Sequence, residues 1–308
     1  MPYALRPAGL ADAPAVTELL NDIDRIEIGR PETDLHTVEA DLKRPDIALD
    51  RDSWLVFDGD RLVAYGLLWD ESGSERVDVD HYVLPDHQRA GELIFDALEA
   101  RSLEKAQANG AARAVVHLHL NTEPTLDTGL IEKRGWHVVR RYHVLQRPLD
   151  AAADHLPELP PGVRLRPCAE EADRARVHAL YQSSFAAHFD FQRRTYDQWL
   201  HDVDADVLDW SLVWIVGTED LGDAGFLISR DDREAMGWIR SIGVLREARG
   251  SGLGGLLLRH AFAAFAARGR DTVGLGVDTA NSTGAPALYA RHGMAVHYAV
   301  DTWETVLI

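Results

Sequence analysis

An internal repeat constrains this 308-residue sequence more than any other feature. The triplet Leu-Arg-Pro occurs at residues 5–7 and again at 165–167, and each copy precedes a segment with apolar residues at helical spacing. Further pairs of similar segments follow in the same order: 53–69 with 211–229, 85–98 with 246–257, and 130–136 with 288–294. Matching segments in one order predict two copies of a single fold.

A proline-containing segment separates the two copies. Residues 149–162 read LDAAADHLPELPPG, and their prolines and small polar side chains are typical of a surface linker. We therefore expect domains at 1–150 and 163–308, joined by a linker at 151–162. Each copy has the pattern of a helix, antiparallel strands, a glycine-marked turn into a helix, another strand, a short helix and closing strands. This order predicts an α/β (α+β) fold with a mixed, mostly antiparallel sheet flanked by helices.

Composition narrows the possible classes of protein. The chain is 46% hydrophobic and 27% charged, which is typical of a globular protein. Its net charge of −18 disfavours nucleic acid and anionic membranes as partners. The sequence shows neither a membrane-spanning run nor a signal peptide, so we expect a cytoplasmic protein. The single cysteine, Cys168, cannot form an internal disulfide or a thiolate metal site.

A glycine-rich turn in the second copy is the strongest chemical signal. A predicted strand ends in Ile242, Gly243 and Val244, and residues 249–255 read RGSGLGG before an apolar helix. Glycines between a strand and a helix let backbone N–H groups approach an anion, and the helix dipole adds to the attraction. The turn therefore predicts a pyrophosphate site.

The same glycines permit two other interpretations. Gly250, Gly252 and Gly255 also satisfy the G-x-G-x-x-G pattern of dinucleotide-binding folds. Residues 256–308 are, however, too few for the several βα units that follow such a fingerprint. A glycine turn without any ligand is the remaining alternative.

At these residues the sequence resembles the GNAT superfamily of acyl-CoA-dependent N-acyltransferases. Arg249-x-x-Gly252-x-Gly254 is similar to the first signature of that family, and Asn281 with the segment 287–293 is similar to the second. The resemblance covers both copies, and it is strongest to the tandem-domain, mycothiol synthase-like actinobacterial group. It implies two tandem GNAT domains, each with a splayed pair of parallel strands, and it implies acetyl-CoA as co-substrate without a metal.

The resemblance also implies a binding mode. The pantetheine arm would enter the gap between the splayed strands and bond the backbone of Ile242, Gly243 and Val244. Arg249 and, less specifically, Arg246 would supply positive charge, although Arg246 also reads as a solvated turn residue. The pyrophosphate would lie on the amides of the turn, which belong to Gly250, Ser251, Gly252, Leu253 and Gly254. Asn281 would contact the pantetheine or cap the following helix.

Acetyl transfer to an amine requires two proton movements, and the sequence predicts one of the groups. Tyr289 occupies the place of the family's tyrosine, which protonates the leaving thiolate; simple packing beneath the sheet is the alternative. Its repeat partner, Ile131, cannot donate a proton. Trp238 stands at the position where, by the resemblance, members of the family carry a glutamate that deprotonates the amine. This difference puts mycothiol precursors in doubt as substrates. Water relayed through Glu234, Asp278 or a backbone carbonyl remains a possible route.

The first copy lacks several of these features. Gln88 and Gly91 retain part of the first signature, but Leu93 replaces a small residue and Ile131 replaces the tyrosine. We therefore expect a degenerate N-terminal domain and one active site in the C-terminal domain, acting on a small-molecule amine. A non-catalytic acyl-CoA-binding or regulatory module is the alternative, and the oligomeric state is left open.

Two further patterns have plainer interpretations. His117 and His119 share one strand face without a third ligand nearby, so we expect an exposed face rather than a metal site. The aromatic segment 185–199 lines the acceptor pocket in the family, and it reads equally well as core.

Overall fold

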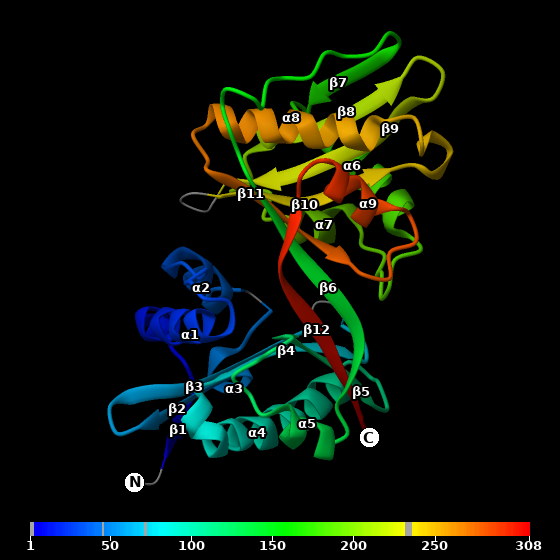
Figure 1. The fold of residues 1–308 in the computed structure, drawn as a ribbon. Coiled ribbons are helices and arrows are strands. Elements are labelled where there is room, and N and C mark those ends of the chain that lie inside the picture. Colours follow the sequence, from blue (N-terminus) through cyan, green and yellow to red (C-terminus); the bar gives the residue numbers. More distant parts are fainter. Residues whose placement is uncertain (1–2, 45, 71–72, 232–235) are drawn as a thin grey trace. The chain divides into compact units, whose positions relative to one another are not determined.

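The computed structural model describes residues 3–44, 46–70, 73–231 and 236–308. The chain forms two compact units (Figure 1). Unit 1 comprises Met1–Tyr142 and Tyr298–Ile308, and unit 2 comprises His143–His297.

Unit 1 is a mixed sheet with helices on both faces. Its strand order is β1-β2-β3-β4-β5-β12, antiparallel throughout except for the parallel pair β4 and β5. The strands are β1 (Ala4–Arg6), β2 (Ser53–Asp58), β3 (Arg61–Trp69), β4 (Arg76–Val83), β5 (Ala114–Asn121) and β12 (Ala295–Leu307). The helices are α1 (Ala13–Glu27), α2 (Leu35–Leu42), α3 (Leu49–Asp52), α4 (Gln88–Ala108) and α5 (Thr128–Lys133).

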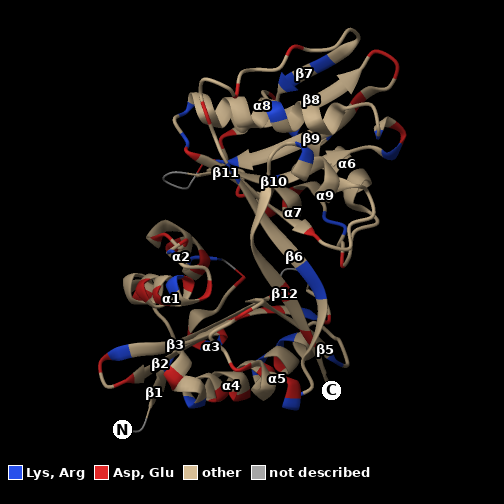
Figure 2. Cartoon of the chain, viewed as in Figure 1, with Lys and Arg blue, Asp and Glu red and all other residues tan. Residues whose placement is uncertain are grey.

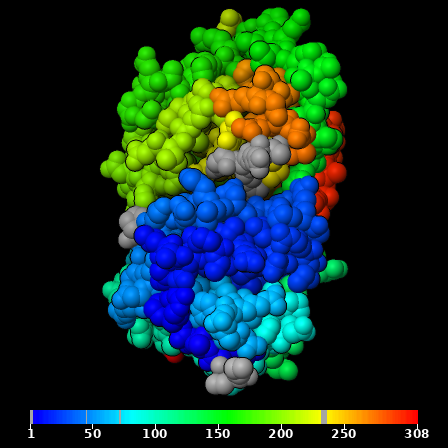
Figure 3. Space-filling model, turned by 90° about the vertical axis from the view of Figure 1, so that its left-hand side faces the viewer, coloured from blue at the N-terminus to red at the C-terminus, as the bar shows by residue number. Residues whose placement is uncertain are grey.

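The longer helices of unit 1, α1 and α4, bury apolar residues against the sheet. In α1, Val16, Leu19, Leu20 and Ile23 recur at helical spacing and are buried, and a proline in the first turn favours the helix start. α1 and α2 lie on one face of the sheet, and α4 and α5 lie on the other (Figure 1). The dark blue surface in Figure 3 belongs to the N-terminal part of the chain that includes α1 and α2.

Unit 2 repeats this arrangement. Its strand order is β7-β8-β9-β10-β11-β6, with β10 and β11 parallel. The strands are β6 (His137–Pro148), β7 (Val163–Pro167), β8 (Val213–Thr218), β9 (Gly222–Arg230), β10 (Met236–Val244) and β11 (Thr272–Asp278). The helices are α6 (Glu171–Phe185), α7 (Tyr196–Asp202), α8 (Leu253–Ala267) and α9 (Ala285–Arg291).

The core of unit 2 has two parts, one on each face of its sheet. α8 is buried along most of its length and packs with Leu145, Val273 and Tyr289. α6 and α7 form the second part around Trp199 and Phe226. The predicted fold, a mixed sheet flanked by helices in two similar copies, is confirmed.

The sixth strand of each unit comes from the other half of the chain. β12, at the C-terminal end, pairs antiparallel with β5 from Val300 to Leu307, and Trp303 joins the core of unit 1. β6, which precedes the linker, follows β11 in the sheet order, and Leu145 joins the core of unit 2. The compact units therefore differ from the expected domains 1–150 and 163–308 at these strands, because strand pairing and not chain continuity decides where an edge strand belongs. Residues 151–162 contain no helix or strand.

Within the described part of the chain, no helix is both long enough and apolar enough to cross a membrane.

Candidate active site

The two parallel strands of unit 2 separate halfway along their length. β10 and β11 pair from Met236 with Thr272 to Ile239 with Leu275, and the pairing ends there. β10 continues to Val244 alongside β9 alone, with a bulge between Ile239 and Ser241. A bulge bends a strand and increases its twist, which accounts for the separation. The predicted splay is present, and it leaves one backbone edge of residues 242–244 facing the gap.

Close packing of glycines keeps the upper part of β10 in the sheet. A Cβ atom on Gly243 would lie 2.5 Å from the ring of Phe226, and one on Gly225 would lie 2.9 Å from the carbonyl oxygen of Gly243. Both distances are shorter than real Cβ contacts, so a side chain at either position would displace the strand. Gly243 is thus needed for the packing of β10.

The glycine turn that follows β10 is open. Gly250 and Gly252 have φ angles of +83° and +87°, which L-residues adopt at a cost, and a Cβ on either would meet nothing within 4 Å. Gly252 is the N-cap of α8. The backbone N–H groups of residues 250–255 have no hydrogen-bond partner within the described part of the chain. These amides are therefore free to bind an anion, as the sequence predicts.

Side chains brace the turn from within. The Nε of Arg249 donates to the carbonyl oxygen of Val244 at 3.1 Å, and the hydroxyl of Ser251 donates to the carbonyl oxygen of Ala248 at 2.6 Å. Arg249 is exposed, so its terminal nitrogens remain in solvent beside the open amides. Arg246 is also exposed.

Tyr289 lies on α9 with its ring in the core of unit 2. The residue is 5% exposed and belongs to the same apolar cluster as Leu253 and Val277, which come from α8 and β11. Its hydroxyl has no hydrogen-bond partner among the described residues. Burial raises the pKa of Tyr289 to about 12, so the phenol is protonated at neutral pH. The structure thus combines the packing role with a free proton donor.

Asn281 has a clear structural role. Its Oδ1 accepts hydrogen bonds from the backbone N of Thr283 at 2.8 Å and from the hydroxyl of Thr283 at 2.5 Å. This is an Asx turn that shapes the approach to α9, where Gly284 is the N-cap. The Nδ2 of Asn281 is free of protein partners in the described structure and remains available to a ligand.

The strand segment where the resemblance predicts a base holds other side chains in the structure. The ring of Trp238 lies over β11, where a Cβ on Gly274 would come within 2.8 Å of it. The bulge residue Arg240 pairs with Asp202 at 3.0 Å. Asp278 accepts a hydrogen bond from the backbone N of Ala280 at 2.8 Å. Glu234 lies outside the described residues, so none of the described candidates is an unpaired carboxylate.

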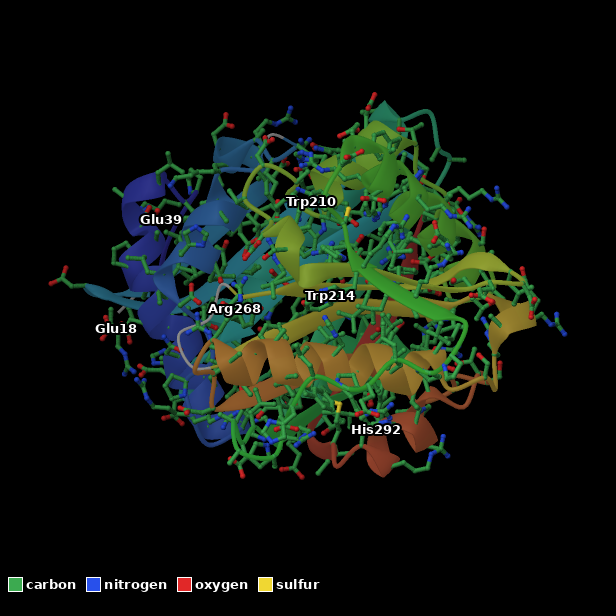
Figure 4. The ribbon with its side chains drawn as sticks, turned by 90° about the horizontal axis from the view of Figure 1, so that it is seen from above. Glu18, Glu39, Trp210, Trp214, Arg268 and His292 are labelled. Carbon is green, nitrogen blue, oxygen red and sulfur yellow. The ribbon has the colours of Figure 1, made fainter. Side chains whose placement is uncertain are left out.

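His292 has no functional role in the predictions from sequence, where it is only one residue of the repeated segment 288–294. Its Nδ1 donates to the carbonyl oxygen of Leu288 at 2.8 Å, which leaves Nε2 as an acceptor. A Cβ on Gly255 would lie 3.0 Å from the His292 ring, so this ring packs against the first turn of α8 (Figure 4). Its position three residues after Tyr289 on one helix face could have marked it, because residues at i and i+3 are neighbours.

The equivalent turn in unit 1 has a different structure. α4 begins at Gln88 itself, so the residues that correspond to the open turn are helical. The side chain of Gln88 donates from Nε2 to the carbonyl oxygens of Pro85 and Thr125, and its Oε1 accepts a hydrogen bond from the backbone N of Asp127. Gly91 is buried, and His81 fills the space next to it, with His81 Nε2 donating to the Gly91 carbonyl oxygen at 3.0 Å. Ile131 is fully buried.

Of the two histidines of β5, His119 is exposed as expected and His117 is buried. His117 is 3% exposed, and its Nε2 lies 2.7 Å from Glu304 on β12. The Nδ1 of His119 forms a hydrogen bond of 3.1 Å with the hydroxyl of Thr302, which also lies on β12. The expectation is wrong for His117 because β12, from the far end of the sequence, pairs beside β5 and places Glu304 directly opposite His117. No group of three or more metal-ligating side chains occurs among the residues that the structure describes.

The aromatic segment of unit 2 contributes to the core around α6. Trp199 is fully buried, and Phe185 lies 4.3 Å from the ring of His188 and 4.9 Å from that of Tyr181, measured between ring centroids. Phe185 is only partly buried, so the segment combines core packing with an accessible aromatic edge.

This fold and site define an acetyltransferase. The acetyltransferase (GNAT) family model matches residues 174–294. A mycothiol acetyltransferase of Kytococcus sedentarius is 30% identical over 247 residues, which span 78% of this chain and 77% of that protein. The chain belongs to the GNAT family of acyltransferases, whose members use acetyl-CoA.

Other similar proteins agree with this assignment. A mycothiol acetyltransferase of Thermobispora bispora is 29% identical over 269 residues, covering 80% of this chain and 81% of the relative. The crystal structure of a GCN5-related N-acetyltransferase from Sphaerobacter thermophilus matches with a TM-score of 0.81 and 25% identity, covering 99% and 95% of the two chains. A tandem GNAT protein from the clavulanic acid biosynthesis pathway matches with a TM-score of 0.72 and 19% identity, covering 99% and 98%, and shows the shared fold.

Proposed function

We propose that this enzyme transfers an acetyl group from acetyl-CoA to the primary amine of a small molecule, at one site in unit 2. The observation that supports this most is the run of unpartnered amides at residues 250–255, which directly follows the unpaired edge of β10. A pyrophosphate can accept hydrogen bonds from these amides, and an extended arm that contains amide groups can pair with the free edge of the strand.

Each part of the site has a distinct task in binding. The amides of residues 250–254 and the guanidinium of Arg249 would hold the pyrophosphate, and local positive charge matters because the chain has a net charge of −18. The backbone of Ile242, Gly243 and Val244 would bond the pantetheine. Asn281 Nδ2 would add one donor near the start of α9.

The chemistry requires a neutral amine and a protonated leaving sulfur. Acetyl-CoA supplies an activated thioester; a bond forms between the amine nitrogen and the carbonyl carbon, and the carbon–sulfur bond breaks. Tyr289 would hold its phenolic proton toward the sulfur, and burial favours the neutral form of this phenol. Because Trp238 and Arg240 occupy the strand segment of the family's base, we infer that solvent accepts the proton from the amine.

Unit 1 does not offer a second equivalent site in this proposal. The helical start of α4 and the bonds of Gln88 leave no open glycine turn there. We therefore expect one molecule of CoA per chain, a stoichiometry that isothermal titration calorimetry measures directly.

The test is a thiol-release screen of the full chain with acetyl-CoA and a panel of amines. The panel includes the unacetylated mycothiol precursor, because two relatives are named mycothiol acetyltransferases. We expect thiol release with at least one small amine and a matching acetylated product in mass spectrometry. Saturable CoA binding without thiol release across the panel would instead favour a binding module.

A further inference from the structure

A group of polar side chains in unit 1 lies between the sheet and helices α1 and α2. On β4, the half-buried residues Asp78, Asp80 and Tyr82 alternate with buried ones, so they share one face of the sheet. Tyr65 lies directly opposite Tyr82 on β3, and the two rings are stacked with centroids 6.2 Å apart. Acidic residues of α1 and α2 contribute to this side of the unit (Figure 2).

Tyr65 provides a buried polar group without a partner. The residue is 3% exposed, and its hydroxyl makes no hydrogen bond with any described residue. The hydroxyl oxygen is not among the fully buried polar atoms, so it stays accessible to a ligand although the rest of the side chain is buried. Burial, followed by the carboxylates of Asp80 and Asp41, raises the pKa of Tyr65. Because residues that lie directly opposite each other share a face of the sheet, Tyr65 lies on the same face as Tyr82 and Asp80.

Asp80 is the second unpartnered side chain. It makes no hydrogen bond or ion pair within the described structure. Burial, Asp41 and Asp78 raise its pKa to about 7, and the charge of Arg44 lowers it only in part. Arg44 is itself paired with Asp46 at 3.0 Å and lies over the ring of Trp69. The positive charge that acts on the pKa of Asp80 is therefore already shared with Asp46.

The neighbouring acids show what a purely structural role looks like. Asp24 accepts hydrogen bonds from the backbone N of Glu32 and the hydroxyl of Thr33, and it fixes the segment after α1. Asp78 pairs with Arg76 at 2.5 Å. Asp80, Tyr65 and Tyr82 have no such partners, although Asp24, Asp41 and Asp80 all act on the pKa of Tyr82.

These groups match the needs of an organic ammonium ion. A carboxylate supplies the opposite charge, and two phenolic oxygens accept the remaining N–H groups of a primary ammonium. We propose that Asp80, Tyr65 and Tyr82, with the carboxylate of Asp41, form an ammonium-binding site in unit 1. The site does not depend on the acetyl-transfer proposal, since it involves neither the glycine turn nor Tyr289.

The probe is putrescine, a four-carbon diamine that is cationic from pH 6 to 8, and 1,4-butanediol is the neutral analogue of equal length. Binding to the full chain, without acetyl-CoA, is measured by isothermal titration calorimetry. An ammonium ion binds the ionised form of Asp80, which rises from about 10% at pH 6 to about 90% at pH 8 for a pKa of about 7. We expect putrescine to bind about tenfold more tightly at pH 8, and the diol not to bind.

Variants separate this site from general attraction to an acidic protein. Asp80→Asn should weaken putrescine binding by about tenfold or more at pH 8 and remove the pH dependence. Asp86→Asn removes an exposed charge elsewhere in unit 1. It should change neither the affinity for putrescine nor the pH dependence of binding. Tyr65→Phe should weaken binding but leave the melting temperature unchanged or higher, because no internal hydrogen bond is lost.

Several outcomes would overturn the proposal. These are the absence of saturable putrescine binding at pH 8, equal binding of the diol, or equal weakening by Asp80→Asn and Asp86→Asn. A lower melting temperature for Tyr65→Phe would show that its hydroxyl has a partner in the protein and would remove Tyr65 from the site.

Discussion

Tyr289 combines two properties that are usually separate. Its ring fills a place in the core of unit 2, and its hydroxyl has no partner among the described residues. A phenol with a pKa of about 12 does not lose its proton near neutral pH. Any pH dependence of activity between pH 6 and 9 therefore belongs to the amine or to another group.

We expect Tyr289→Phe to lower kcat by about tenfold or more, with the Kd of CoA changed by less than about twofold. Phenylalanine keeps the ring that packs and removes only the proton donor. Steady-state kinetics and calorimetry of CoA binding measure the two effects separately. Tyr3→Phe is the matched control, because Tyr3 bonds His87 in unit 1. An unchanged kcat, with chemistry rate-limiting, would exclude Tyr289 as the acid.

Single residues differ in how far sequence alone predicts their roles. The positive φ angles of Gly250 and Gly252 agree with the expectation of bare backbone, since glycine adopts them without strain. The hydrogen bonds by which Asn281 forms a turn are visible only in the structure. From sequence, an asparagine at this position is equally consistent with a helix cap and with a residue that contacts a ligand. His292 could not be placed against Gly255 without the packing of α9 on α8.

At the level of elements, similar sequences at the start of α4 and α8 form different structures. In unit 2 two left-handed glycines hold the chain open before α8 begins at Leu253. In unit 1 the helix begins at Gln88, whose side chain bonds residues on both sides of it. The sequence predicted a poorer site in the first copy from Leu93, but the physical cause seen here is the earlier helix start.

We expect Gly252→Leu to weaken CoA binding by about tenfold or more, because its amide and those of its neighbours would no longer be accessible together. A left-handed leucine also costs about 1–2 kcal/mol of stability. Gly269→Leu is the matched control: Gly269 also has a positive φ, of +75°, with nothing within 4 Å of a Cβ, but it lies after the other end of α8. Calorimetry gives the Kd of CoA and thermal unfolding gives the stability of each variant. Equal loss of CoA affinity in both variants would contradict a specific role for the turn.

At the scale of the whole molecule, the exchanged sixth strands are the feature that the sequence did not reveal. The repeat and the proline-rich segment predict two copies and a linker from local patterns alone. Strand pairing between β5 and β12 joins residues that are far apart in the chain, and no local pattern in either strand specifies the other as its partner. Local patterns therefore identify β12 as a strand but not its neighbour.

The terminal strand should be necessary for the stability of unit 1. Without residues 298–308, β5 becomes an unpaired edge, Trp303 leaves the core and His117 loses Glu304. We expect residues 1–142 alone to aggregate or to melt without cooperativity. The same fragment joined to residues 298–308 through a flexible Gly/Ser linker should be monomeric and melt cooperatively, as judged by size-exclusion chromatography and circular dichroism. A fusion with the eleven residues in scrambled order controls for added length, and cooperative unfolding of the unfused fragment at the temperature of the intact fusion would show that β12 is dispensable for unit 1.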